Sequence, residues 1–123
     1  MRSILFAAAT AALALGQIAL ANVAEAKSGS FAGQGRYDVS GQARIVKSGS
    51  GYAVRLSGFR STSGPDLYVY VGQGGPQRRI AKLRRTSGTQ TYKLPAGVTP
   101  DSVSTVHIHC RRFNSTFGTA RLR

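Results

Sequence analysis

The segment Ser102-Val103-Ser104-Thr105-Val106-His107-Ile108 is rich in β-branched residues and alternates between apolar and polar side chains. This two-residue period is typical of a half-buried β-strand. The segment opens residues 101–117, the one long stretch after position 26 that contains neither glycine nor proline. Elsewhere, glycines and prolines divide the chain into pieces of ordinary strand length. The sequence therefore predicts an all-β fold, arranged as a single antiparallel β-sandwich or small barrel.

Short segments with turn residues between them are predicted to form the strands. Residues 67–71 are apolar throughout and are expected in the interior of the sheet, while 41–46 and 52–57 are expected to pair as a hairpin. The predicted strands are residues 31–34, 41–46, 52–57, 67–71, 78–83, 89–94, 103–110 and 116–122. We find no internal repeat, so residues 27–123 are predicted to be one domain.

Residues 1–26 are predicted to be a secretory signal peptide that precedes this domain. Arg2 supplies positive charge, residues 4–21 are mostly apolar, and Ala24-Glu25-Ala26 has the small-x-small pattern of a cleavage site. An earlier cut after Ala21 and an uncleaved membrane anchor are the alternatives. Cleavage would place the domain in the periplasm or outside the cell, with no transmembrane span after processing.

Charge and composition exclude several classes of protein. The chain has 17 Lys and Arg against 4 Asp and Glu, a formal net charge of +13, with one cysteine and two histidines. One cysteine cannot build an internal disulfide framework, and these ligands alone cannot close a four-ligand zinc site. A hydrophobic fraction of 41% is too high for a disordered basic tail. Neither a nucleophile elbow nor a pair of catalytic carboxylates is visible, so we do not expect an enzyme.

Five short motifs follow one another along the chain: Phe31-x-Gly33 with Val39-Ser40-Gly41-x-Ala43, Ser63-Gly64-Pro65-Asp66-Leu67-Tyr68-Val69-Tyr70-Val71, Gly88-Thr89-Gln90-Thr91-Tyr92-Lys93-Leu94-Pro95, Val106-His107-Ile108-His109-Cys110-Arg111-Arg112-Phe113 and Phe117-Gly118-x-Ala120-x-Leu122. In this order and spacing they resemble the DM-thirteen domain family, also called the electron-transfer DM domain. The resemblance implies a β-sandwich and an electron-transfer role outside the cytoplasm, with a redox partner in the cell envelope. It also implies that Cys110 is the redox thiol or helps to hold a group such as haem.

The chain departs from the family pattern at two places. The position before the cysteine, which is often aromatic in the family, is His109, and residues 78–85 are unusually basic. There is no C-x-x-C-H motif for covalent haem attachment. A haem or a metal is therefore compatible with the resemblance but is not required by it.

Two interpretations of Cys110 follow from the residues themselves. Arg111 and Arg112 would favour the reactive thiolate if all three side chains shared a surface. Alternation instead places Cys110 on the same strand face as Val106 and Ile108, where an inward-facing thiol would be shielded in the core.

His107 and His109 fall on the opposite face of the same strand. Two histidines at this spacing could hold a metal or give haem an axial ligand, as accessory groups to Cys110. They could share a ligand shell with the cysteine only if a bulge reversed the pleat near His109. Because the sequence supplies no third ligand, we expect an exposed polar face that carries two imidazoles.

A basic cluster supports the alternative function, a non-catalytic cationic module that binds anionic components of the cell envelope. Its partner would be an anionic lipid or surface polymer, and nucleic acid is not expected. The competing interpretation is a solvated face. The cluster consists of Arg78, Arg79, Lys82, Arg84 and Arg85, and we expect Arg111 and Arg112 to join it. Pro65 and Asp66 are predicted to form a turn.

Overall fold

The computed structural model describes residues 25–123, and these residues are almost entirely β-structure. The predicted signal peptide therefore lies outside the described residues, apart from its last two positions. The elements are β1 (Glu25–Gly33), β2 (Val39–Ser48), β3 (Gly51–Ser61), β4 (Leu67–Gly72), β5 (Arg78–Lys82), β6 (Gln90–Lys93), the 3₁₀ helix η1 (Pro100–Ser102), β7 (Thr105–Cys110) and β8 (Ser115–Arg121).

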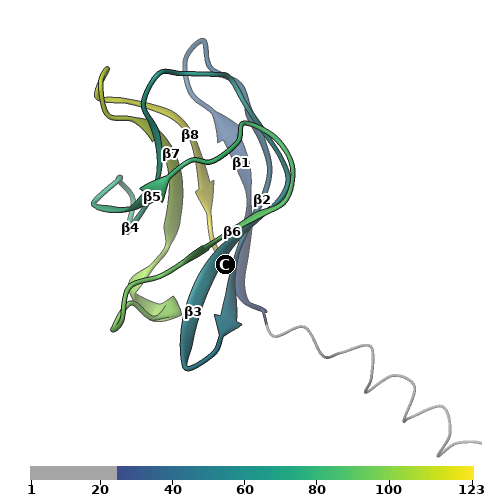
Figure 1. Cartoon of the computed structure of the whole chain (residues 1–123), viewed down its shortest axis with the longest axis vertical. Helices are drawn as coiled ribbons and strands as arrows, with labels where there is room; N and C mark the ends of the chain where they lie inside the picture. The colour runs from purple at the N-terminus through teal and green to yellow at the C-terminus, as the bar shows by residue number, and fades with distance from the viewer. Residues whose placement is uncertain (1–24) are drawn as a thin grey trace, which may run out of the picture.

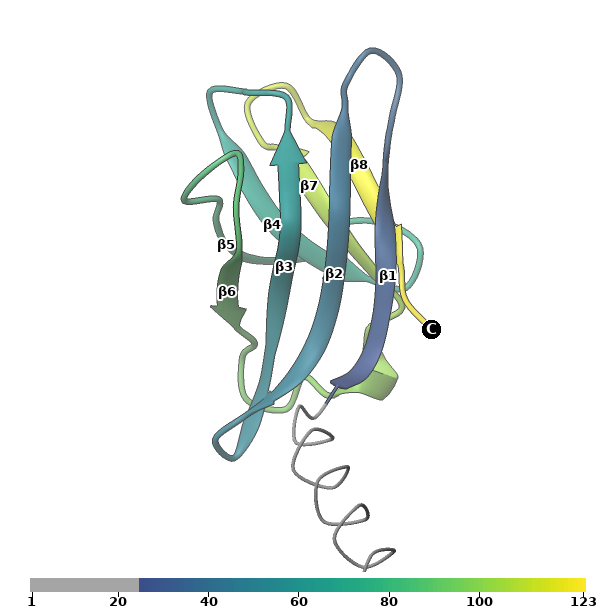
Figure 2. The ribbon, with the colours of Figure 1, turned by 90° about the vertical axis from the view of Figure 1, so that its right-hand side faces the viewer.

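All neighbouring strands are antiparallel and form one strongly curved sheet in the order β5-β4-β7-β8-β1-β2-β3-β6. Strand β1 joins the two halves, because Glu25–Ser30 pairs with β2 whereas Phe31–Gly33 pairs with β8. The sheet consequently folds into two facing layers, with β1, β2, β3 and β6 in front of β4, β7 and β8 (Figures 1 and 2). The all-β prediction is confirmed, as a nearly closed, barrel-like sheet.

The predicted strands all exist, but several bounds differ. The hairpin of β2 and β3 runs from Val39 to Ser61 and turns tightly at Gly49, whose φ is 58°. Strand β1 begins six residues before the predicted Phe31, because residues 25–30 pair with β2 through their backbone although their side chains are mostly polar. Strand β7 begins two residues later than predicted, because η1, its C-cap Val103 and a bend at Ser104 precede it.

The core lies between the two layers and is built from alternate residues of each strand. Phe59, 2% exposed, meets the Phe31 ring edge-on at 5.6 Å between centroids. Phe117 stacks on Tyr37 at 3.7 Å and closes another part of the core. Across β4 and β7, apolar side chains pair on the inner side. Burial of these side chains supplies most of the favourable free energy of folding.

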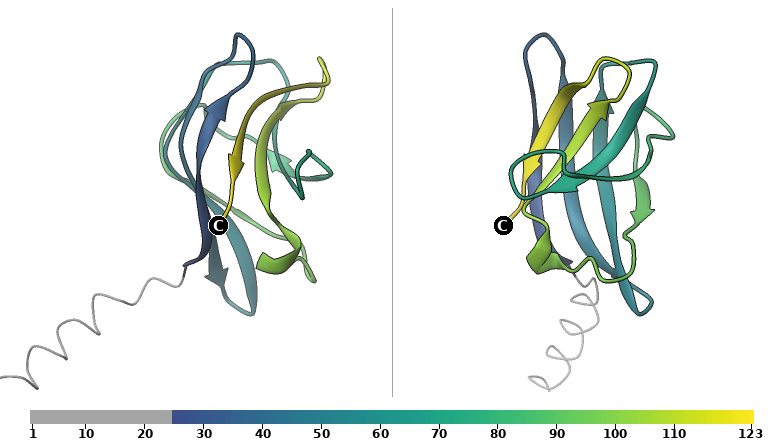
Figure 3. Two further views of the ribbon diagram at one scale, coloured as in Figure 1. Left: turned by 180° about the vertical axis from the view of Figure 1, so that it is seen from behind. Right: turned by 90° about the vertical axis from the view of Figure 1, so that its left-hand side faces the viewer.

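Strand β7 differs from the others because all six of its residues are buried. Its inner side faces the core, and the loop after β4, residues 73–77, crosses its outer side (Figure 3, right). The loop folds back so closely that a Cβ at Gly72 would overlap the carbonyl oxygen of Gly75. Across residues 25–123, no helix has the length and apolar character needed to span a bilayer.

Candidate functional site

Cys110 is the last residue of β7, and its thiol is enclosed in the core. The residue is 0% exposed and belongs to the same apolar cluster as Val106 and Ile108. Its neighbours across the sheet are Leu67 on β4 and Ser115 on β8. The alternation argument therefore places this side chain correctly, and the resting structure shields the sulfur.

A basic pocket lies directly beyond Leu67. This pocket, of about 430 Å³, has Leu67 and Leu83 among its lining residues together with Lys82, Arg84 and Arg85. Leu67 is paired with Cys110 across the sheet and both are buried, so a residue that lines this pocket is the strand neighbour of the cysteine. Cys110 itself does not line the pocket.

The turn next to Leu67 is tied to the end of β7. Pro65 and Asp66 form this turn, as predicted, and the backbone carbonyl of Asp66 accepts a hydrogen bond from the Arg111 amide at 3.0 Å. The Leu67 carbonyl accepts another bond, from the Leu83 amide at 2.9 Å. These two backbone bonds hold the turn and Leu67 between the end of β7 and the segment that follows β5.

His107 is buried on the other side of β7 and is 1% exposed. Its Nδ1 is hydrogen-bonded to Thr119 Oγ1 at 2.9 Å, and its Nε2 to Thr105 Oγ1 at 2.8 Å. The amide of Gly74, in the loop that covers this strand, donates to the same Thr105 oxygen at 3.1 Å. Burial lowers the pKa of His107 to about 4, against a backbone hydrogen bond with Gly75 that raises it. The imidazole is therefore neutral at pH 7.

His109 is 7% exposed and occupies a similar polar niche. Its Nε2 donates to Asn114 Oδ1 at 3.3 Å, and its Nδ1 is 2.9 Å from Thr116 Oγ1. The ring of Tyr70 meets the imidazole edge-on at 5.1 Å between centroids. The predicted exposed face is therefore wrong, because both histidines are buried: loop 73–77 lies against Thr105 and His107, and Tyr70, Asn114 and Thr116 surround His109.

A bulge in β8 provides the two threonines. Between Ile108 and His109 the register shifts, so that Ile108 pairs with Gly118 and His109 pairs with Thr116. The extra residue, Phe117, points into the core, while Thr116 and Thr119 reach the histidines. Strand β7 itself keeps its alternation, so Cys110 remains on the opposite side from both imidazoles.

This geometry does not fit a haem or a metal ligated by the two histidines. All four ring nitrogens are hydrogen-bonded to side chains of the protein itself. Within residues 25–123, no cluster of three or more His, Cys, Asp or Glu side chains could hold a metal ion. Ligation would require breaking the threonine bonds and removing loop 73–77.

The basic cluster divides into two parts. Arg79 and Arg111 both lie over the Tyr68 ring, at 5.4 and 5.5 Å from its centroid, so Arg111 joins the cluster as predicted. Arg84 turns toward β6, where it donates to the Thr91 carbonyl at 2.6 Å and covers Tyr92. Arg85 donates to a carbonyl of the loop before β6. Arg78, Lys82 and Arg112 are exposed.

Sequence reasoning missed the groups that enclose the histidines. Thr105, Thr116 and Thr119 carry no sequence signal beyond their preference for strands, and their roles depend on the bulge. The glycines at 72, 74 and 75 were the one available indication of this loop: Gly72 allows its close approach and Gly74 has a positive φ.

Comparison with protein families identifies the family of this chain. The model of the family described as Electron transfer DM13 matches residues 30–122, as the sequence motifs predicted. Neither a curated protein nor a solved structure matches the chain.

Proposed function

The chain belongs to the Electron transfer DM13 family, and from this premise we propose that it is an exported electron-transfer domain whose redox group is Cys110. The family description supports the redox role. The observation that supports the assignment to Cys110 is its pairing with Leu67, a residue that lines a basic pocket. We propose a carrier rather than an enzyme.

The chemistry of this carrier is exchange with a partner that contains a disulfide. The chain has one cysteine, so its disulfide state requires a second thiol from outside. Cys110 loses its proton to solvent, its thiolate attacks one sulfur of the partner disulfide, and the other partner sulfur leaves as a thiolate. The cysteine is oxidised and the partner is reduced in the mixed disulfide. A second partner thiol reverses the exchange.

The buried thiol can react only after a local opening. Movement of Leu67 and its turn breaks the Asp66–Arg111 and Leu67–Leu83 backbone bonds but leaves the rest of the sheet paired. Local openings of this kind require less free energy than global unfolding. The rate of thiol exchange should therefore depend on the closure over Cys110 and exceed the rate of unfolding.

The test is the rate at which glutathione disulfide forms a mixed disulfide with the folded protein. Leu67→Ala shortens the lining residue that is paired with Cys110, and Val71→Ala is the matched control, because Val71 faces the same core from the other end of β4. We expect Leu67→Ala to raise the rate at least tenfold over Val71→Ala, after correction for global stability measured in urea. Cys110→Ala should give no adduct. If Cys110 reacts at the global unfolding rate in every variant, the redox assignment is wrong.

One observation favours a second function, the cationic module. Arg79 and Arg111 converge on Tyr68 from different strand ends, and this leaves a compact exposed patch of charge. We propose that this patch binds an anionic lipid or surface polymer. Each Lys or Arg near an anionic membrane surface contributes about 1 kcal/mol.

Binding to vesicles that contain an anionic lipid tests this second function. Arg79→Gln combined with Arg111→Gln should weaken binding about tenfold or more. Arg55→Gln combined with Lys93→Gln removes the same charge from exposed positions on β3 and β6 and should have a smaller effect. Equal losses in the two double variants, or binding that persists in high salt, would contradict a defined cationic patch.

A further inference from the structure

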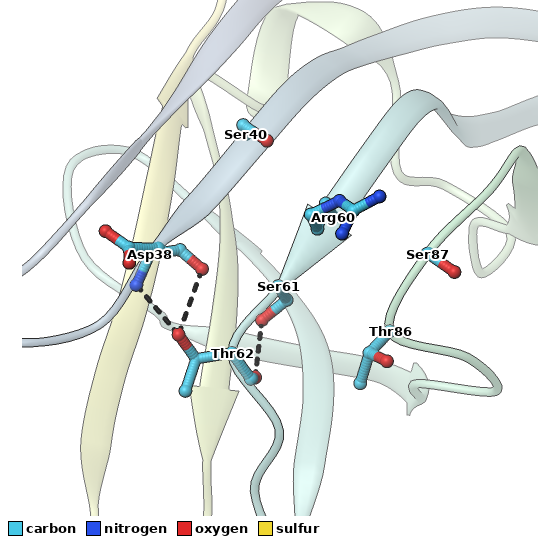
Figure 4. Close-up of a pocket in the computed structure, with 7 residues that line it drawn as sticks. All are labelled: Asp38, Ser40, Arg60, Ser61, Thr62, Thr86 and Ser87. Atoms are coloured by element: carbon cyan, nitrogen blue, oxygen red, sulfur yellow. Dashed lines mark hydrogen bonds between the residues drawn. The ribbon is translucent and has the colours of Figure 1, made fainter.

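A polar pocket between β2, β3 and the segment before β6 is lined by neither Cys110 nor the histidines, although Thr86 and Ser87 also line the basic pocket near Leu67. The polar pocket has a volume of about 370 Å³. Ser40 pairs with Arg60, and Arg60 pairs with Ser87, so these three residues form one row across three adjacent segments. All three are exposed. Figure 4 shows Arg60 between Asp38 on one side and Thr86 and Ser87 on the other.

The backbone beneath this pocket is fixed by hydrogen bonds. The Asp38 amide donates to Thr62 Oγ1 at 2.9 Å, and the Thr62 amide donates to the Asp38 carbonyl at 2.8 Å. On the opposite side, the Ser61 amide donates to the Thr86 carbonyl at 2.8 Å. The hydroxyls of Ser61 and Thr62 are thus part of the framework, since both bond to nearby backbone groups. These bonds fix the positions from which the exposed side chains of Asp38, Ser40 and Arg60 extend.

The remaining polar groups of the pocket are available to a ligand. The one ion pair within residues 25–123 joins Glu25 and Arg44, so neither Asp38 nor Arg60 is neutralised by a salt bridge. Arg60 supplies only donors, in a planar arrangement that matches an acidic group. Asp38 supplies only acceptors, which suit hydroxyl groups. The hydroxyls of Ser40, Thr86 and Ser87 can donate or accept.

We propose that this pocket binds an acidic saccharide, a sugar unit with a carboxylate on its ring. The carboxylate pairs with Arg60, and hydroxyls of the ring donate to Asp38 and bond to the serine and threonine hydroxyls. No simple anion uses both ends of the pocket, because a bare anion is repelled by the Asp38 carboxylate. No neutral sugar satisfies the guanidinium charge. The volume is at the small end of ligand pockets, which are about 300–1,000 Å³, so a single sugar unit is the expected occupant.

The test is a titration of the isotope-labelled protein, followed by amide chemical shifts in NMR spectra. Three probes are compared. Glucuronate carries both the ring hydroxyls and the carboxylate, glucose carries the hydroxyls alone, and acetate carries the carboxylate alone. We expect glucuronate to shift the amides of residues 38–40, 60–62 and 86–88, with an affinity at least fivefold above either of the other probes. Acetate binding as tightly as glucuronate would show an adventitious ion only and overturn the proposal.

Variants separate this pocket from the general positive charge of the protein. Arg60→Gln should remove the preference for glucuronate over glucose, and Asp38→Asn should weaken both sugars but not acetate. The matched control is Arg55→Gln, which removes an exposed arginine from the same strand outside the pocket. If Arg55→Gln weakens glucuronate as much as Arg60→Gln does, binding is due to net charge and the site does not exist. Neither result bears on Cys110, so the redox proposal stands or falls separately.

Discussion

Acidification should destabilise the domain through His107, whose surroundings exclude the charged form. Burial between the sheet and loop 73–77 lowers the pKa of this residue from 6.5 to about 4, and the nearby charges of His109 and Arg121 add to the effect. In the unfolded chain the pKa of the same histidine returns to about 6.5. Between these two values the unfolded state binds a proton that the folded state does not. Stability therefore falls as the pH falls through this window.

The size of this effect follows from the two pKa values of His107, about 4 when folded and 6.5 when unfolded. Each pKa unit corresponds to about 1.4 kcal/mol, so acidification from pH 7 to below pH 4 should remove about 3 kcal/mol of stability. Above pH 7 the contribution is constant, because neither state is protonated. Such a loss is a large part of the roughly 5–15 kcal/mol by which domains are stable.

Urea unfolding followed by circular dichroism measures this dependence at pH 7, 5.5 and 4. The comparison variant is His107→Gln, which keeps hydrogen-bonding groups near Thr105 and Thr119 but does not titrate. Other groups titrate equally in both proteins, so the difference in unfolding free energy between them isolates His107. That difference should change by about 3 kcal/mol between pH 7 and pH 4. If the two proteins lose stability in parallel as the pH falls, the conclusion that His107 is buried in its neutral form is wrong.

Three further predictions concern the core. Gly118→Ala would place a Cβ 2.5 Å from that of Val39, and this overlap should lower the free energy of unfolding by about 1–3 kcal/mol. Adding Val39→Ala should restore part of that loss. Thermal melting in which the double variant is the least stable of the three proteins would contradict this explanation. Cys110→Ser introduces a hydroxyl into an apolar site and should lower the free energy of unfolding by about 1–3 kcal/mol. A serine variant that is more stable than Cys110→Ala would show instead that the site is polar. Phe59→Ala should cost about 3–5 kcal/mol in urea unfolding, and a loss below about 1 kcal/mol would show that this ring is not a core residue.

The sequence was informative wherever side chains alternate between core and solvent. Strands β4 and β7 were located within two residues, because their inner residues form continuous apolar rows. The beginning of β1 was missed for the complementary reason. Residues 25–30 contribute backbone hydrogen bonds to β2 and few buried side chains, and a pairing of backbone groups leaves no hydrophobic pattern in the sequence.

The two sides of β7 show where sequence reasoning about the site succeeds and fails. Alternation alone placed Cys110 inward with Val106 and Ile108. The same argument gave His107 and His109 an outer face but could not decide whether water reaches it. That depends on loop 73–77 and on a one-residue shift in β8, both of which are tertiary features. Burial, and with it the lowered pKa of His107, became visible only in the structure.

The order of the strands leaves β5 and β6 without a second hydrogen-bonded neighbour. Open strands of this kind can recruit further chains and seed fibrous aggregates. Here β5 carries Arg78, Arg79 and Lys82, and β6 carries Lys93, all exposed. Another copy of the protein that approached this opening would meet like charge before any backbone bond could form. The arginines that we propose as a binding surface for an anionic partner would therefore also keep crowded copies of the domain apart.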